Sequence, residues 1–324
     1  MTRRLDIRSA LNETLHAEMA RDPRILVFGE DVSISVMGVT AGLHERFGSE
    51  RVLDMPISEA AFIGMAVGAA ACGLRPVVEL MFADFAGVCF DQILNQAAKL
   101  RYITNGRVTV PLVIRTTIGA GDSSAAQHSQ SLQHLFTSIA GLKCVLPASA
   151  ADAGGLLLSA IADPDPVLFL EHKMLYDATE EVPDGPLAPV PLGQARMVRK
   201  GSHLTIVAFS RMVSFALEAA DLLAREGIEA ELIDPRTSAP LDEAAILASV
   251  ARTGRLMVVD EGAARCGLAQ DIAALVASRG FRDLKAPVAL VTPPHVPVPF
   301  APTLEQAWLP SPADIMKAAR QLLS

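Results

Sequence analysis

Short runs of apolar residues alternate along the chain with longer segments in which apolar residues recur every three or four positions. The runs are continuous, which is typical of parallel strands covered on both faces, and the longer segments are typical of helices packed on a sheet. This alternation, with short connections, predicts an α/β fold. The runs are RILVFGE, RPVVELM, VPLVIRTT, LKCVLP, PVLFLEH, HLTIVAFS, EAELIDPR, RLMVVDE and PVALVTPP.

The helical segments fall into two series. We expect helices after Asp6, after Ser58 and over 85–102 and 149–163, and then over 212–227, 242–253, 267–280 and 313–323. Between the series, residues 173–192 are rich in proline and lack a periodic apolar face, which is typical of a linker. The sequence therefore predicts two stacked α/β domains with mostly parallel sheets, over residues 1–180 and 199–324, joined by a linker at 181–198.

Composition narrows the class of protein. The chain has 324 residues, of which 51% are hydrophobic and only 5% aromatic, so two cores built mainly of aliphatic residues are expected. A net charge of −8 without a long basic run argues against nucleic acid or an anionic membrane as partner. No uncharged apolar stretch reaches the roughly 18 residues of a membrane span, and charges in MTRRLDIRSALNETL disfavour a signal peptide.

The four cysteines refine the expected location. They form no CxxC pair and each stands in an apolar context. This favours buried thiols in a reducing compartment over disulfides or zinc sites. We therefore expect a cytoplasmic protein.

Several catalytic motifs are absent. No GxGxxG follows an expected strand, and neither GxxxxGK[ST], HExxH nor GxSxG occurs. The sequence thus disfavours a dinucleotide site, a P-loop, a zinc peptidase and an α/β-type serine hydrolase.

One carboxylate stands in an unusual place. Glu59 lies at the start of PISEAAFIGMAVGAAACG, a run of small apolar residues. An acid in the first turn complements the helix dipole, and Ser58 is a candidate N-cap. Because burying a charged carboxyl group is costly, a functional role is the alternative interpretation, and spacing alone leaves both open.

A second candidate is His128, in a loop that follows the expected strand ending near Thr117. Ligands of open α/β sheets bind at the carboxyl ends of the strands, and histidine exchanges a proton near neutral pH. A structural histidine bonded to a loop carbonyl is equally compatible with this position. Phe82 and Phe85, at a strand-to-helix junction, are either core residues or a platform for a planar ring.

These residues also carry a resemblance to a known family. The strings FGEDV, RVLDMPISEAAFIGMAVGAAACGLRPVVELMFADF, DQILNQAAK, AAQHSQS, SAIADPDPVLFLEH and IDPRT resemble the beta subunit of thiamine-diphosphate-dependent 2-oxo acid dehydrogenase complexes, which are transketolase-like enzymes. The resemblance spans nearly the whole chain. Within the family, MFADFAGVCFDQILNQAAKLRY, FLEHKMLY and PPHVPVPFAP are most similar to acetoin dehydrogenase beta subunits.

The resemblance implies roles for individual residues. Glu59 matches the glutamate that hydrogen-bonds the aminopyrimidine of thiamine diphosphate, and Phe85 matches the aromatic residue that packs against this ring. His128 matches the active-site histidine near the substrate and the incoming lipoyl group. The implied reaction cleaves acetoin to acetaldehyde and transfers the remaining two-carbon unit to lipoamide as an acetyl group.

The resemblance also implies partners and metal ions. In the family a GDG motif followed by Asn-Asn holds the diphosphate and Mg²⁺, and this chain lacks it. An alpha subunit is therefore expected to supply that half of the site, in an assembly of two alpha and two beta chains that serves a lipoyl-bearing acyltransferase. A potassium ion is implied at positions matching Leu112, Ala160, Ile161, Asp163 and Asp165.

Two alternatives remain at this point. In the first, the substrate is pyruvate or a branched-chain 2-oxo acid in place of acetoin, and the pocket wall around Val88 discriminates among these substrates. In the second, the chain is a non-catalytic scaffold that docks the alpha subunit or the acyltransferase, and Glu59 and His128 have no catalytic function.

Overall fold

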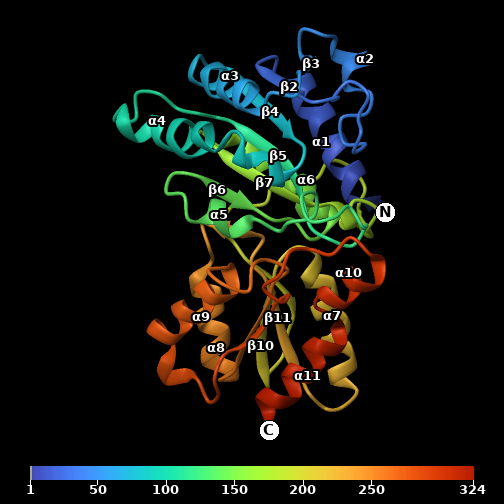
Figure 1. Ribbon diagram of the computed structural model, residues 1–324, viewed down its shortest axis with the longest axis vertical. Coiled ribbons are helices and arrows are strands. Elements are labelled where there is room, and N and C mark those ends of the chain that lie inside the picture. Colours follow the sequence, from blue (N-terminus) through green and yellow to red (C-terminus); the bar gives the residue numbers. More distant parts are fainter. Residues whose placement is uncertain (1) are drawn as a thin grey trace. The chain divides into compact units, whose positions relative to one another are not determined.

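The computed structural model describes residues 2–324, which fall into two compact units. Unit 1 contains the chain up to Ile118 together with Leu135–Leu192, and unit 2 contains Gly119–His134 and Gly193–Ser324. Each unit is built from strands and helices in alternation (Figure 1), which confirms the predicted fold class. The predicted domain boundaries stay a prediction, and Met1 lies outside the described residues.

Unit 1 is built on a parallel sheet. Its strands lie in the order β6-β7-β5-β4-β2-β3, and every neighbouring pair is parallel. A separate antiparallel pair joins β1 to β8. The strands are β1 (Thr2–Asp6), β2 (Ile25–Gly29), β3 (Val52–Asp54), β4 (Arg75–Leu80), β5 (Val113–Ile118), β6 (Lys143–Val145), β7 (Val167–His172) and β8 (Thr179–Pro183).

The helices of unit 1 connect these strands. The α-helices are α1 (Ile7–Arg21), α2 (Leu43–Phe47), α3 (Glu59–Ala71), α4 (Ala98–Ile103), α5 (Gln133–Thr137), which crosses into unit 1 from unit 2, and α6 (Ala150–Ala162). Three further segments are η1 (Ala83–Gly87) and η3 (Lys173–Leu175), which are 3₁₀-helical, and η2 (Gln92–Ala97), which is π-helical.

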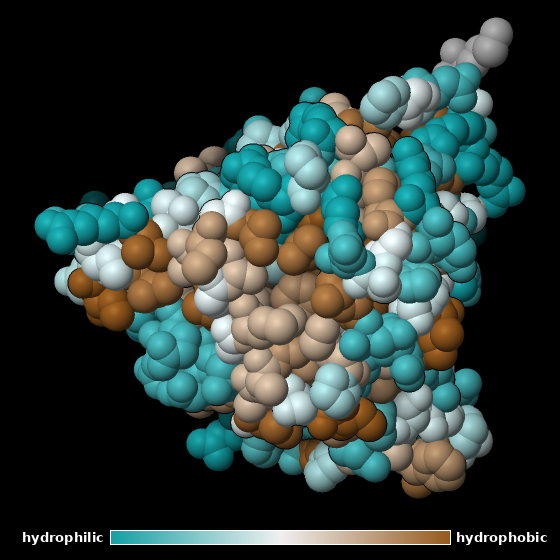
Figure 2. Space-filling model, turned by 90° about the horizontal axis from the view of Figure 1, so that it is seen from above, coloured by the Kyte–Doolittle hydropathy of each residue, from teal (hydrophilic) through white to brown (hydrophobic). Residues whose placement is uncertain are grey.

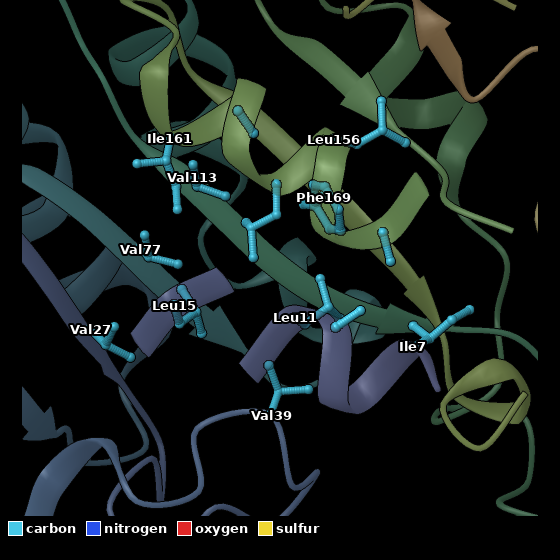
Figure 3. Packing of buried hydrophobic residues seen from close by; sticks show 14 of the residues in the cluster. Ile7, Leu11, Leu15, Val27, Val39, Val77, Val113, Leu156, Ile161 and Phe169 are labelled. Atoms are coloured by element: carbon cyan, nitrogen blue, oxygen red, sulfur yellow. The ribbon is translucent and has the colours of Figure 1, made fainter. Parts of the chain in front are cut away.

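The core of unit 1 explains why α1 and α6 form where they do. The buried side chains of α1 recur at Ile7, Leu11 and Leu15, so they lie on one face of the helix. Figure 3 shows them packed with residues of α6 and of strands β2, β4, β5 and β7. Alternate residues of these strands, such as Phe28 and Val78, are buried as well, so the sheet is covered on both faces as predicted.

A buried ion network joins three neighbouring strands of this sheet. Arg115 on β5 is 1% exposed, donates through Nε and Nη2 to Glu171 on β7 at 2.7 and 2.8 Å, and donates through Nη1 to Glu79 on β4 at 2.8 Å. Tyr176 donates to Glu171 at 2.7 Å. Burial alone would lower the pKa of Arg115, but the two carboxylates raise it and keep the guanidinium charged.

Unit 2 has a smaller sheet. Its order is β14-β13-β10-β11-β9, parallel except for the edge strand β9. The strands are β9 (Arg196–Arg199), β10 (Leu204–Ala208), β11 (Ala230–Asp234), β12 (Thr237–Ala239), β13 (Leu256–Val259) and β14 (Ala289–Val291). The helices are α7 (Arg211–Ala224), α8 (Glu243–Thr253), α9 (Leu268–Arg279), η4 (Phe281–Asp283), α10 (Pro302–Trp308) and α11 (Pro312–Leu323).

Three details differ from the sequence-based expectation. The helix expected over 85–102 is divided into η1, η2 and α4, and the expected linker region holds β8 and the start of β9. Two cysteines, Cys72 and Cys266, are exposed, although all four were expected to be buried. Within residues 2–324, no helix is long and apolar enough to cross a membrane.

The ion network yields a stability prediction. Arg115→Met should lower the free energy of unfolding by roughly 3–5 kcal/mol, because it leaves Glu79 and Glu171 buried without a positive charge. Urea unfolding of the two proteins measures the difference. Arg24→Met, which removes an exposed ion pair with Asp22, is the control and should cost much less. Equal losses in the two variants would contradict this account of Arg115.

Candidate functional site

Glu59 is the first residue of α3 and is 7% exposed. Among residues 2–324, no ion pair or side-chain hydrogen bond with its carboxylate is found. Ser58 occupies the N-cap position, as predicted, but its side chain makes no capping hydrogen bond. Glu59 is therefore a largely buried residue at a helix N-terminus, and no basic side chain among the described residues pairs with its carboxylate.

A second carboxylate, which the sequence analysis did not select, belongs to the same site. Glu30 follows directly on β2, and its Oε1 is buried without a hydrogen-bond partner among the described residues. Burial raises the pKa of Glu30, and the charge of Glu59 raises it further. At its last residue, Gly29, strand β2 passes very close to β4. A Cβ added at Gly29 would lie 2.3 Å from the backbone oxygen of Glu79. The available signal was an acid at the carboxyl end of a buried parallel strand.

Cys89 shows how poorly solvated this region is. The residue is fully buried, and its pKa is raised to about 12, first by burial and then by the charge of Glu59. The surroundings of Cys89 therefore favour the neutral thiol over the thiolate. The charge of Glu59 thus raises the pKa of both Glu30 and Cys89, which places the three side chains near one another.

Phe85 lies in η1, at the predicted junction between β4 and the following helical segments. It is half-buried, and its ring centroid is 6.4 Å from that of Phe82 at an interplanar angle of 57°. Val88, three residues later, is 61% exposed. The π-helical turn of η2 follows, and such turns are frequent at functional sites.

His128 lies in unit 2, in the segment Gly119–His134, which is irregular up to the start of α5 at Gln133. Its backbone N–H donates to the carbonyl oxygen of Ala125 at 3.4 Å. A cavity of about 560 Å³ in unit 2 is lined by this segment, including Gln127 and Gln130, and by residues of the C-terminal part. The predicted site residues are thus divided, with Glu59 and Phe85 in unit 1 and His128 in unit 2.

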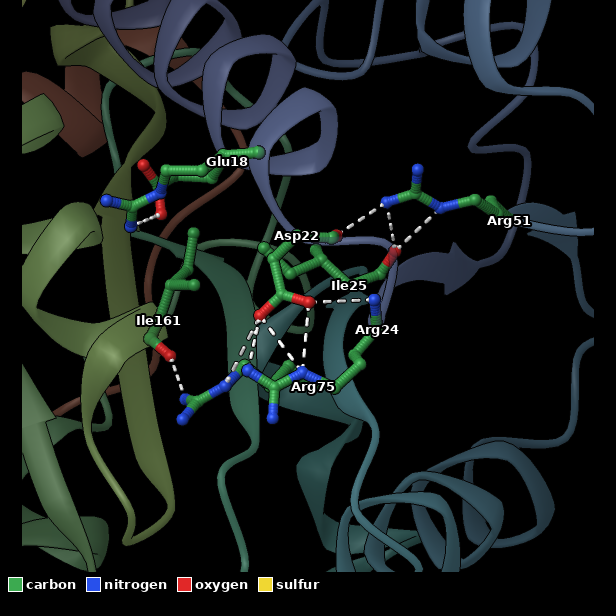
Figure 4. Close-up of polar contacts among 8 residues, drawn as sticks. Glu18, Asp22, Arg24, Ile25, Arg51, Arg75 and Ile161 are labelled. Atoms are coloured by element: carbon green, nitrogen blue, oxygen red, sulfur yellow. Dashed lines mark hydrogen bonds and ion pairs between the residues drawn. The ribbon is translucent and has the colours of Figure 1, made fainter.

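The residues expected to bind potassium already have partners in the protein. Lys143 Nζ lies 2.6 Å from both carboxylate oxygens of Asp163 and 3.4 Å from Asp165, which also binds Arg101. The carbonyl oxygen of Ile161 accepts a hydrogen bond from Arg75 at 2.6 Å (Figure 4).

The remaining carbonyls of this set are also engaged. The Leu112 carbonyl accepts from Val167 N and the Ala160 carbonyl from Asp163 N. The ammonium group of Lys143 thus binds the carboxylates of Asp163 and Asp165, where a potassium ion was expected. This donor set does not fit a potassium ion, and the ion stays a prediction.

Comparison with known proteins identifies both parts of the chain. A family model for the transketolase pyrimidine-binding domain matches residues 3–179, and one for the transketolase C-terminal domain matches residues 193–315. Among solved structures, a split-gene transketolase described as an inactive beta4 tetramer has a similar fold, with a TM-score of 0.80 and 25% identity over 98% of each chain.

Curated relatives cover the full chain. The acetoin:2,6-dichlorophenolindophenol oxidoreductase subunits beta of Cupriavidus necator and Bacillus subtilis are 52% and 49% identical over 100% of this chain and 98% of theirs. The pyruvate dehydrogenase E1 component subunit beta of Rickettsia felis is 44% identical over 98% of both chains.

The unpaired carboxylates yield a pH prediction. Because the folded-state pKa of Glu30 is raised, folding favours its protonated form, and stability is lost as the pH rises through that pKa. Glu30→Gln should therefore raise the thermal unfolding midpoint at neutral pH, and this gain should vanish below about pH 4.3, the ordinary pKa of glutamate. Thermal unfolding over a pH series measures both effects.

The control for this prediction is Glu13→Gln. Glu13 is exposed and paired with Arg3, so its amide variant should bring no gain at neutral pH. Parallel curves for Glu30→Gln and the parent at every pH would show that the Glu30 carboxyl group is not destabilised by its surroundings.

Proposed function

Because the chain belongs to the transketolase family, with the pyrimidine-binding and C-terminal domains of that family, we propose that it is the beta subunit of a thiamine-diphosphate-dependent acetoin dehydrogenase. In the proposed reaction, the bond between the carbonyl and carbinol carbons of acetoin breaks and acetaldehyde leaves. The other two-carbon unit is oxidised to an acetyl thioester while the disulfide of lipoamide is reduced. The higher identity to the two acetoin relatives than to the pyruvate relative supports acetoin as substrate.

The observation that carries this proposal is the buried, unpaired carboxyl group of Glu59. When bound, thiamine diphosphate supplies a nucleophilic carbon that attacks the substrate ketone and accepts the electrons left by carbon–carbon cleavage. Glu59 would hold a proton at a ring nitrogen of the aminopyrimidine, and at a largely buried position this hydrogen bond is strong. The buried Oε1 of Glu30, which lacks a protein partner, is an acceptor that such a ligand can satisfy.

Phe85 and His128 have separate proposed roles. Phe85 would pack its ring against the aminopyrimidine and hold it in orientation, since offset or tilted aromatic pairs are favourable. His128 would move a proton to or from the substrate or the lipoyl sulfur, because histidine carries out such transfers near neutral pH.

The diphosphate half of the site is proposed to come from an alpha subunit. Within residues 2–324 no cluster of three or more His, Cys, Asp or Glu side chains is arranged to hold a metal ion. The structural relative described as an inactive beta4 tetramer supports the same view, since it is a beta assembly without activity. Mg²⁺ is therefore assigned mainly to the alpha chain.

Unit 1 offers an apolar surface for assembly. Figure 2 shows hydrophobic residues gathered in one area of the face toward the viewer. Exposed apolar patches of this kind mark protein contacts. We propose an assembly of two alpha and two beta chains that serves a lipoyl-bearing acyltransferase in the cytoplasm. Exposed large apolar side chains around α3 and α4 are Ile57, Met65, Val88, Tyr102 and Ile103.

A paired rate measurement tests the proposal. The chain is purified together with its alpha subunit, and thiamine-diphosphate-dependent reduction of 2,6-dichlorophenolindophenol is followed with acetoin and with pyruvate. Acetoin should be turned over faster. Glu59→Gln should lower the rate by about 100-fold or more, since proton transfer from a positioned group contributes that much.

The matched control is Glu18→Gln, which neutralises another buried glutamate of unit 1, one that is paired with Arg21. It should keep most of the activity. A preference for pyruvate would overturn the substrate assignment but keep the family chemistry. Full activity of Glu59→Gln would refute its proton-holding role and favour the scaffold alternative.

A further inference from the structure

The segment Gly119–His134 is held in an unusual backbone conformation. Before α5 it contains no regular helix or strand, and φ is positive at Gly121 (124°), Ser123 (59°) and Ala125 (64°). Left-handed backbone is unfavourable for a residue other than glycine. Because the segment also lines the 560 Å³ cavity, packing supports it on only part of its surface. Other interactions must therefore fix its shape.

Glu305 on α10 supplies one of these interactions. It is 2% exposed, and both of its carboxylate oxygens accept hydrogen bonds from the segment. Oε1 accepts from Gly121 N at 2.8 Å, and Oε2 accepts from Ser123 N at 3.0 Å and from Ser123 Oγ at 3.3 Å. The positive φ angles at Gly121 and Ser123 fit a backbone concavity of the kind that binds anions. One buried carboxylate thus fixes the strained turn before His128.

Glu261, after β13, binds the segment on both sides of His128. It is 5% exposed, and its Oε1 accepts from Ala120 N at 2.7 Å and from Ser131 Oγ at 3.2 Å. The carbonyl oxygen of Ala120 in turn accepts from Arg211 Nη1 at 2.9 Å. Further along, Gln133 donates to Asp260 at 2.7 Å. All of these groups belong to unit 2.

We infer that Glu305 and Glu261 are positioning residues that hold the segment around His128 in its working conformation. The loop is bonded by the carboxylates of Glu305, Glu261 and Asp260, and burying such charged groups is costly unless they are well hydrogen-bonded. Backbone amides of a surface loop can bond water instead, so these carboxylates are not needed merely to satisfy the amides. The bonds lie on both sides of His128, at Ala120, Gly121 and Ser123 before it and at Ser131 and Gln133 after it. The C-terminal domain then has a part in catalysis in addition to assembly.

This inference rests on the proposed role of His128 in acyl transfer, so its test has two independent readouts in the complex with the alpha subunit. The first is kinetic. Glu305→Gln places an amide N–H₂ against backbone donors, and the rate of acetyl transfer to lipoamide should fall about 10-fold to 100-fold. In Glu305→Gln the rate of acetyl transfer should fall by a larger factor than the rate of dye reduction. His128→Ala should show the same difference between the two rates.

A double-mutant cycle separates positioning from general destabilisation. If Glu305 acts through His128, the variant carrying both substitutions should transfer acetyl groups no more slowly than His128→Ala alone. Glu305→Asp, which keeps the charge, should be intermediate. Additive losses would overturn the inference.

The matched control is Asp242→Asn. Asp242 also accepts two backbone N–H bonds in unit 2, from Ala195 at 3.0 Å and Ala245 at 3.1 Å, but away from this segment. It should lower stability without changing the ratio of the two rates. An equal change of that ratio in Asp242→Asn would mean that Glu305 has only a structural role.

The second readout is amide hydrogen exchange, which does not depend on activity. Glu305→Gln should speed exchange over 119–134 by about 10-fold or more, while the strands of unit 2 keep their protection. Unchanged exchange would overturn the inference whatever the rates. If His128→Ala transferred acetyl groups normally while exchange rose in Glu305→Gln, the proposed role of His128 would fail and the carboxylates would be shown to order the segment without serving catalysis.

Discussion

A carboxylate removed from water must be paired with a cation, hydrogen-bonded or protonated, and this constraint separates the buried glutamates of the chain by role. Glu171 is paired with Arg115, and Glu305 is hydrogen-bonded by backbone N–H groups. Glu59 has neither kind of partner among the described residues, and the neighbouring Glu30 has an orphan oxygen. These two neighbouring carboxylates can accept a bond from a ligand, and this is why the cofactor chemistry is proposed at Glu59.

The paired and hydrogen-bonded acids stabilise the elements that carry the proposed site residues. The ion network on β4, β5 and β7 stabilises the sheet that also contains β2, and Glu30 directly follows β2. The bonds to Glu305 and Glu261 fix the segment of His128. Preorganised groups of this kind reduce the reorganisation needed during a reaction. In the proposed mechanism, unit 1 would supply the carboxyl group that holds a proton at the aminopyrimidine, and unit 2 would fix the geometry of the histidine proposed for acyl transfer.

Sequence patterns predicted what depends on local periodicity, and they failed where distant residues decide. The continuous apolar runs located most strands of both sheets but missed the short strands β3, β9 and β12. The isolated acid in a small apolar run indicated Glu59 as a candidate. The period of apolar residues did not distinguish the π-helical turn at Gln92–Ala97 from an α-helix. Glu261 and Glu305 carry no local signal, because their partners Ala120 and Gly121 are 141 and 184 residues away. The Lys143–Asp163 pair, which disfavours potassium, became evident only from the fold.

The central claim is that this chain contributes the pyrimidine half of a cofactor site that an alpha subunit completes. Calorimetric titration of thiamine diphosphate with Mg²⁺ into the chain alone, into the alpha subunit alone and into the two together tests it most directly. The account predicts stoichiometric binding only for the combined subunits, with little or no heat from this chain alone, because the chain lacks the GDG and Asn-Asn motif that the family resemblance assigns to the diphosphate and Mg²⁺. Tight one-to-one binding by the isolated chain would contradict it.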